Sequence, residues 1–269
     1  MPYPTSSAAS PAFATAPWRW AAAGALGGLV LAFVLFAPAR WLASLVLQAS
    51  GGHAVLAAPR GSFWQGSAQL VLSGGAGSLD AVALPGRVSW HIRPAWTGLD
   101  LQLNAECCMQ QAWRLQARPA GWGGVQLALS DSQSQWPAAL LSGLGTPWNT
   151  VQAQGQLAAS TQGLNARWTQ GRLALAGRLQ LDALQISSRL STLQPMGSYR
   201  VTLTGGNPST LELSTLGGSL LLTGQGRWVG QRLHFDGTAS ATSGSVDALS
   251  NLLNIIGRRN GATAVIKVG

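Results

Sequence analysis

An uncharged apolar run at residues 20–36 (WAAAGALGGLVLAFVLF) restricts what this chain can become. A helix rises about 1.5 Å per residue, so the run would span roughly 26 Å, close to the hydrocarbon thickness of a bilayer. Trp18 and Trp20 lie at its start and Trp41 lies beyond its end, which suits anchoring at both membrane interfaces. The sequence therefore predicts a transmembrane anchor with an amphipathic extension, together covering residues 18–48.

A cleavable signal peptide is the alternative interpretation of the same run. Residues 37–39 (APA) resemble a signal-peptidase site, but the run is longer than a usual signal core and only Arg19 charges the segment before it. Because Arg19 and Arg40 flank the run on both sides, basic residues give little preference for orientation. We expect residues 1–17 to form a disordered cytoplasmic tail, and we expect a retained anchor that exports the remaining domain.

From Gly61 onward, apolar residues recur at every second position, as in Val88, Trp90 and Ile92. Successive side chains of a strand point to opposite faces, so this period indicates strands with one apolar and one polar face. Charged residues make up only 9% of the chain, which argues against disorder. The sequence predicts an all-β fold, a large and strongly curved antiparallel sheet that resembles a half-barrel or groove.

One or two short helices should accompany this sheet, one of them near the C-terminus. Residues 134–145 break the strand pattern and predict a short helix capped by Ser134, which separates a first part of the β domain (53–145) from a second part (146–269). Residues 247–256 return to helical spacing, with an apolar stripe that we expect to cover one end of the sheet. That stripe consists of Leu249, Leu252, Leu253 and Ile256.

The net charge of +9 comes almost entirely from arginine, since Lys267 is the one lysine. A nucleic-acid-binding surface needs clustered basic side chains, whereas the adjacent pair Arg258 and Arg259 is the one such cluster here. We therefore expect no nucleic-acid partner. Contact with anionic lipid headgroups is the better match for dispersed arginines on a membrane-tethered domain.

Cys107 and Cys108 are neighbours, and a disulfide between adjacent residues requires a strained eight-membered ring. Their spacing does not suit zinc either. We expect two unbonded small side chains at the end of a strand, with a labile vicinal disulfide as the alternative.

No motif in the sequence predicts catalysis. His53, His91 and His234 lack metal-ligand spacing, and the eight acidic residues are spread singly. The glycine-rich residues 224–230 are expected to form a turn rather than a phosphate-binding loop, because no helix pattern follows them. The chain is therefore predicted not to be an enzyme and to bind no cofactor or metal.

Partner docking is the remaining class of site. The chain contains 12 tryptophans, which is a high number for its length, and most of these side chains should fill the sheet interior. Tryptophan is also enriched in interface hot spots. Trp64, Arg258 and Arg259 are the candidate partner-docking residues.

Three patterns, taken in order, resemble the family of type II secretion system protein N. Residues 61–68 (GSFWQGSA) have the pattern Gly-x-x-Trp-x-Gly-x-Ala, residues 84–90 (LPGRVSW) have the pattern Leu-Pro-x-x-x-x-Trp, and residues 252–259 (LLNIIGRR) end a small apolar helix. The resemblance covers nearly the whole chain after residue 18, and its specificity lies in the order and spacing of the patterns.

This resemblance implies a protein of the inner membrane of a Gram-negative bacterium, with a single span and a periplasmic main domain. As a structural or adaptor subunit, it would assist export of folded proteins across the outer membrane. Its partners would be other secretion subunits, in the inner-membrane platform or the outer-membrane channel. The alternative is an AsmA-like lipid-handling or bridge protein with a hydrophobic groove, and the concave face of the sheet would discriminate the two.

Overall fold

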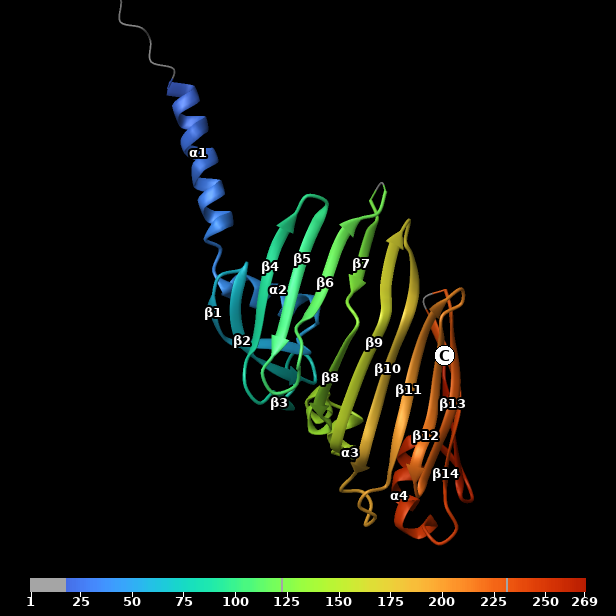
Figure 1. The fold of residues 1–269 in the computed structure, drawn as a ribbon. Coiled ribbons are helices and arrows are strands. Elements are labelled where there is room, and N and C mark those ends of the chain that lie inside the picture. The colour runs from blue at the N-terminus through green and yellow to red at the C-terminus, as the bar shows by residue number, and fades with distance from the viewer. Residues whose placement is uncertain (1–17, 122, 231) are drawn as a thin grey trace, which may run out of the picture. The chain divides into compact units, whose positions relative to one another are not determined.

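The computed structural model describes residues 18–121, 123–230 and 232–269, and the chain divides into two compact units at Ala37 (Figure 1). In the first unit, α1 (Trp18–Leu35) is a single helix of 18 residues that is long and apolar enough to cross a membrane. It coincides with the predicted anchor to within two residues at each end. The predicted tail, residues 1–17, lies outside the described residues.

The second unit, Pro38–Gly269, is dominated by one antiparallel sheet of 16 strands. The strands are β1 (Ala54–Gly61), β2 (Gln65–Ser73), β3 (Ala81–Ala83), β4 (Val88–Ala95), β5 (Gly98–Ala105), β6 (Trp113–Pro119), β7 (Val125–Leu129), β8 (Ser132–Pro137), β9 (Gln154–Thr169), β10 (Arg172–Ser187), β11 (Gly197–Gly206), β12 (Thr210–Gly218), β13 (Leu220–Val229), β14 (Arg232–Ala241), β15 (Arg258–Asn260) and β16 (Thr263–Val268). Their spatial order is β1-β2-β4-β5-β6-β7-β9-β10-β11-β12-β13-β14-β16-β15, with β3 paired to β2 and β8 paired to β9.

Most neighbours in this order are also neighbours in the chain, as expected of a meander built from hairpins. The predictions of a mainly β fold and of a large antiparallel sheet are thus confirmed. Among the described strands, β1 and β15 each end the order with a single partner, so the path is open. Because β7 pairs with β9, the sheet continues across residue 145. The division of the β domain into two parts at that residue stays a prediction. The strong curvature of the sheet also stays a prediction.

At the start of this unit, α2 (Ala39–Ala49) forms the predicted amphipathic extension. It ends where the chain turns through Gly51 and Gly52, both at positive φ. Ala39 and Leu42 pack with residues of β1, β2 and β4 in a small core around Trp90. The opposite side of α2 stays exposed.

The helix predicted at residues 134–145 is wrong in its first part. Residues 132–137 form β8, and a 3₁₀ helix, η1 (Ala138–Leu144), begins only after Pro137. Pro137 is itself extended, at φ −63° and ψ 129°. Ser134 therefore caps no helix, and its hydroxyl accepts a hydrogen bond from the indole of Trp136 at 2.8 Å. A four-residue helix, α3 (Trp148–Val151), follows η1.

The largest core lies under the C-terminal helix α4 (Val246–Ile256). Leu249, Leu252 and Leu253 of this helix are almost completely buried, and Ile256 is partly buried against the same core. Contributions also come from η1 and from strands between β9 and β16. The expectation that the apolar stripe covers one end of the sheet is confirmed. A separate core gathers around Leu84 and Leu140, so three clusters line one face of the sheet.

Two local expectations are overturned. Cys107 and Cys108 are joined by a disulfide, so the prediction of two unbonded thiols is wrong. The ring is accommodated in the turn after β5, where Cys108 is buried in the second core and Cys107 is exposed. The predicted strand end is where the pair lies, and a strand end leaves the backbone freer to turn than a strand interior does, so the eight-membered ring can form there.

The glycine-rich segment 224–230 is largely strand rather than turn, since β13 runs to Val229. A Cβ added at Gly224 or Gly226 would lie within 3.0 Å of the ring of Phe235 on the neighbouring strand. These glycines therefore leave room for an aromatic ring on the sheet surface, which is a packing reason that sequence did not reveal.

Truncation of the buried stripe tests how much this core stabilises the domain. Leu253→Ala should lower the free energy of unfolding by about 2–5 kcal/mol, because it leaves a cavity under α4. The measurement is the denaturant midpoint of the full chain in detergent, followed by tryptophan fluorescence. Ile255→Ala is the matched control on the same helix, since Ile255 is 44% exposed. Equal midpoints for the two variants would show that α4 is not anchored by this stripe.

Candidate functional site

The predicted docking residue Trp64 lies in the turn between β1 and β2. Its ring meets that of Phe63 edge-on, with centroids 5.4 Å apart, and its carbonyl accepts the N–H of Ile92 at 2.6 Å. The side chain is partly buried. Trp64 is therefore a partly covered turn residue with some accessible surface.

The other two docking candidates lie at the far end of the strand order. Arg258 and Arg259 are exposed on β15, where Arg259 Nε donates to the carbonyl of Gly261 at 2.8 Å. Because β15 and the β1–β2 turn belong to opposite ends of the sheet, the structure does not bring these arginines together with Trp64. Two separate surfaces are available instead of one.

The two sequence patterns at residues 61–68 and 84–90 meet in one packing unit. Trp90 is buried and donates its indole N–H to the carbonyl of Phe63 at 3.0 Å. A Cβ on Gly66 would lie 2.5 Å from the ring of Trp90, and Ala68 is fully buried beside it. The small residues of the first pattern therefore accommodate the tryptophan of the second, beneath α2.

In the described part of the chain, no acidic or basic side chain is fully buried. Within residues 18–121, 123–230 and 232–269, no group of three His, Cys, Asp or Glu side chains is placed to hold a metal. A hollow of about 1020 Å³ lies over β12, β13 and β14 and is lined by polar and apolar side chains. Glu212 and Asp236 are its acidic residues, and Asp236 is well exposed and lies 3.7 Å from the equally exposed Lys267. Both side chains face water, so the pair lies on the open surface of the sheet.

Among the described residues, two side chains away from this hollow have buried polar atoms without a hydrogen-bond partner. In the described part of the chain, the hydroxyl of Tyr199 and the indole N–H of Trp113 make no hydrogen bond. Burial raises the pKa of Tyr199, so its hydroxyl stays protonated. Tyr199 belongs to the main core, where Gly197 leaves room for the hydroxyl, so its role is packing.

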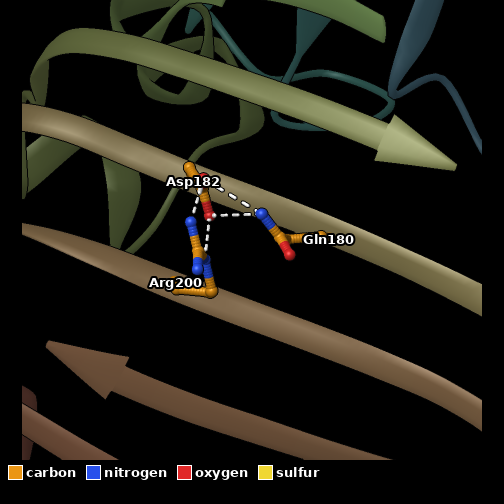
Figure 2. A network of polar contacts seen from close by, with 3 residues as sticks. All are labelled: Gln180, Asp182 and Arg200. Carbon is orange, nitrogen blue, oxygen red and sulfur yellow. Dashed lines mark hydrogen bonds and ion pairs between the residues drawn. The ribbon is translucent and has the colours of Figure 1, made fainter. Parts of the chain in front are cut away.

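The strongest polar interaction links β10 to β11 on the polar face (Figure 2). Arg200 donates from Nε to Oδ1 and from Nη2 to Oδ2 of Asp182, each at 2.7 Å, and Gln180 Nε2 donates to the same carboxylate at 3.1 Å. Asp182 and Arg200 are register partners, so the pair lies directly across the two strands. Their side chains are 16% and 39% exposed, respectively.

This fork geometry determines the ionisation of the carboxylate. The hydrogen bonds from Arg200 lower the pKa of Asp182 below its ordinary value of 3.8, while partial burial acts in the opposite direction. A carboxylate engaged at both oxygens has no free acceptor directed at a substrate. The network therefore fixes the register of β10 and β11 and does not resemble a catalytic group.

The stability contribution of this pair should depend on pH. Since the pKa of Asp182 is lower in the folded state, its contribution is present above pH 3.8 and is lost as pH falls through the folded-state value. The difference in unfolding free energy between the wild-type chain and Asp182→Asn should therefore be largest near neutral pH and shrink in acid. Asp236→Asn serves as the exposed control. Parallel curves for wild type and Asp182→Asn at every pH would contradict the assignment.

Sequence reasoning missed one surface, which we call the turn edge. It is the sheet edge formed by the β1–β2, β4–β5, β6–β7, β9–β10, β11–β12 and β13–β14 turns, and several of them lie at the top of Figure 1, opposite α3 and α4. Trp96 is fully exposed there in the β4–β5 turn, and Trp168 and Leu173 are exposed at the tips of β9 and β10. In the sequence, tryptophans close to turn glycines could have indicated this surface. Only the pairing of the strands shows that the hairpin turns carrying them lie along one edge of the sheet.

These features define a class of protein: a β-sheet domain that follows one apolar helix, with exposed aromatic and basic side chains at separate places. The family profile described as "Type II secretion system (T2SS), protein N" matches residues 53–266, which include strands β1 to β15 and the first four residues of β16. The chain belongs to this family, as the resemblance in the sequence implied. Neither the curated proteins nor the solved structures compared with the chain gave a match.

Proposed function

We propose that this protein is a structural or adaptor subunit of the type II secretion system, anchored in the inner membrane by α1 with its main domain in the periplasm. The observation that carries the proposal is the family match over residues 53–266. Support also comes from α1, which has the length and composition of a single span. A subunit of this kind would assist export of folded proteins across the outer membrane by holding other subunits in place, without chemistry of its own.

The direct partners would be inner-membrane platform subunits or the outer-membrane channel. We propose that they dock at two separate places, one at Trp64 in the β1–β2 turn and one at Arg258 and Arg259 on β15. Two docking sites at opposite ends of a long sheet suit an adaptor that bridges two partners. The division of the domain into parts at residues 53–145 and 146–269 would then separate the two docking regions.

Deletion of the gene should impair release of folded exoproteins, which should accumulate in the periplasm while their synthesis continues. The defect is expected because a missing adaptor weakens the assembly but removes no catalyst. A version without residues 1–37 should fail to rescue secretion, since tethering raises the local concentration of weak partners. The measurement is the ratio of periplasmic to extracellular exoprotein. A phosphatase fused after Gly269 serves as the topology control and should be active.

A lipid-handling function is the second candidate, and one observation favours it. Leu99, Val125 and Leu127 are exposed on the side of the sheet that carries the cores, so apolar surface continues beyond the covered region. The strong curvature predicted from the sequence would turn this surface into a groove. Lipid handling predicts that lipid copurifies with the protein and that the outer membrane becomes leaky on deletion. Normal secretion together with a leaky outer membrane would reject the adaptor proposal.

Charge reversal on β15 tests the second docking place. Arg258→Glu with Arg259→Glu should abolish a crosslink between this domain and an acidic partner subunit in intact cells. Both side chains are exposed, so the unfolding midpoint should change little. Arg114→Glu with Arg189→Glu is the matched control, since both are exposed elsewhere in the domain. Retention of the crosslink in the β15 variant would show that these arginines do not dock a partner.

A further inference from the structure

We propose that the turn edge docks on the anionic surface of the same bilayer that holds α1, through exposed tryptophans and arginines. The proposal rests on the proposed membrane anchor and is independent of the role in secretion. It assigns a membrane-contacting surface to a part of the sheet distant in sequence from the span.

The chain leaves the span at this edge. Leu35 is the last residue of α1, and Pro38, three residues later, forms an isolated β-bridge with Ser62. Ser62 lies in the β1–β2 turn, where its N–H and hydroxyl both contact the carbonyl of Gln65. The β1–β2 turn is part of the turn edge, so the covalent connection to the membrane reaches the domain on the side where the other turns lie.

The apolar side chains at this edge are those that favour a membrane interface. Trp96 is fully exposed at the tip of the β4–β5 hairpin. Val125, Trp168 and Leu173 form one row in register across β7, β9 and β10, and are 46%, 45% and 54% exposed. Side chains paired in register lie on the same face, so this row is a continuous apolar strip at the tips of the hairpins. Tryptophan with its apolar ring and N–H group suits the headgroup region.

The charges at the same tips have the sign that an anionic surface requires. Arg118 and Arg167 lie on the other face of β6 and β9, in register through Gln126 of β7. Their side chains donate to neutral glutamine oxygens, and Arg93 donates to a histidine nitrogen. Arg172 is exposed at the start of β10. Guanidinium groups suit phosphate because their N–H donors can bind two oxygens at once.

The bilayer is favoured over a protein partner because the edge is charged with one sign next to its apolar strip. Residues 93–100, 117–127 and 165–175 contain a single acidic residue, Asp100. The opposite edge of the sheet is mixed: Asp80, Glu106 and Asp247 lie there together with Arg114 and Arg189. A nearby anionic surface would therefore attract the turn edge, at a range set by ionic screening.

The test places a reporter at each edge of the full chain. Trp96→Cys and Leu79→Cys are labelled with an environment-sensitive nitrobenzoxadiazole fluorophore and reconstituted in vesicles of phosphatidylcholine and phosphatidylglycerol. Both native residues are fully exposed, and Leu79 lies in the loop before β3, at the opposite edge. The native cysteines are bonded to each other, and the labelled wild-type chain gives the background. Neither substitution removes a buried contact, so folding should be unaffected.

We expect blue-shifted emission, with quenching by spin-labelled lipid, for the label at residue 96 and water-like emission for the label at residue 79. The shift should fall in vesicles of phosphatidylcholine alone, in high salt, and when Arg118→Gln and Arg172→Gln are added. Water-like emission at both positions in chains that float with the vesicles would overturn the docking proposal and leave the anchor intact. A shift at residue 96 without quenching by spin-labelled lipid would overturn it in favour of contact with a second copy. Chains that do not float would overturn both.

Discussion

Backbone pairing along one open antiparallel sheet is the constraint on which the rest of this structure depends. Every strand from β1 to β16 is part of the same sheet, and hairpins make most of the connections. Such a sheet satisfies its backbone hydrogen bonds internally but leaves one apolar face that water does not solvate well. The chain covers that face with α2, η1 and α4, and the three cores form where these segments pack. Where no segment packs, near the tips of the longer hairpins, apolar side chains remain exposed.

The packing around Trp90 connects the covered apolar face of the sheet with the sequence patterns that suggested the family. The two sequence patterns that resemble type II secretion system protein N meet beneath α2, where Gly66 and Ala68 leave room for the indole ring. These residues stabilise the start of the sheet, next to Pro38, where the chain enters the β-sheet unit. The resemblance noted in the sequence therefore rests on residues that maintain the fold. Function then depends on the surfaces which that fold presents.

Polar interactions have a different role in this protein. The fork of Arg200 on Asp182 joins two neighbouring strands on the polar face, and charged side chains of β12 to β14 line a hollow. A cross-strand pair of this kind favours one register over its neighbours, because a slip of one residue would send the two side chains to opposite faces. The arginines at the turn edge are not engaged in this way and remain available to a partner surface.

The sequence by itself determined the elements that local spacing encodes. An uncharged run predicted α1, an apolar stripe of period 3.6 predicted α2 and α4, and alternation predicted the strands. It also nominated Trp64, Arg258 and Arg259, but these lie at opposite ends of the strand order, which only pairing could decide. Tertiary structure decided the helix start after Pro137, the bond between Cys107 and Cys108, the strand at Gly224 and the gathering of tryptophans at the turn edge. Each of these depends on which distant residues approach in space, and spacing along a chain does not specify that approach.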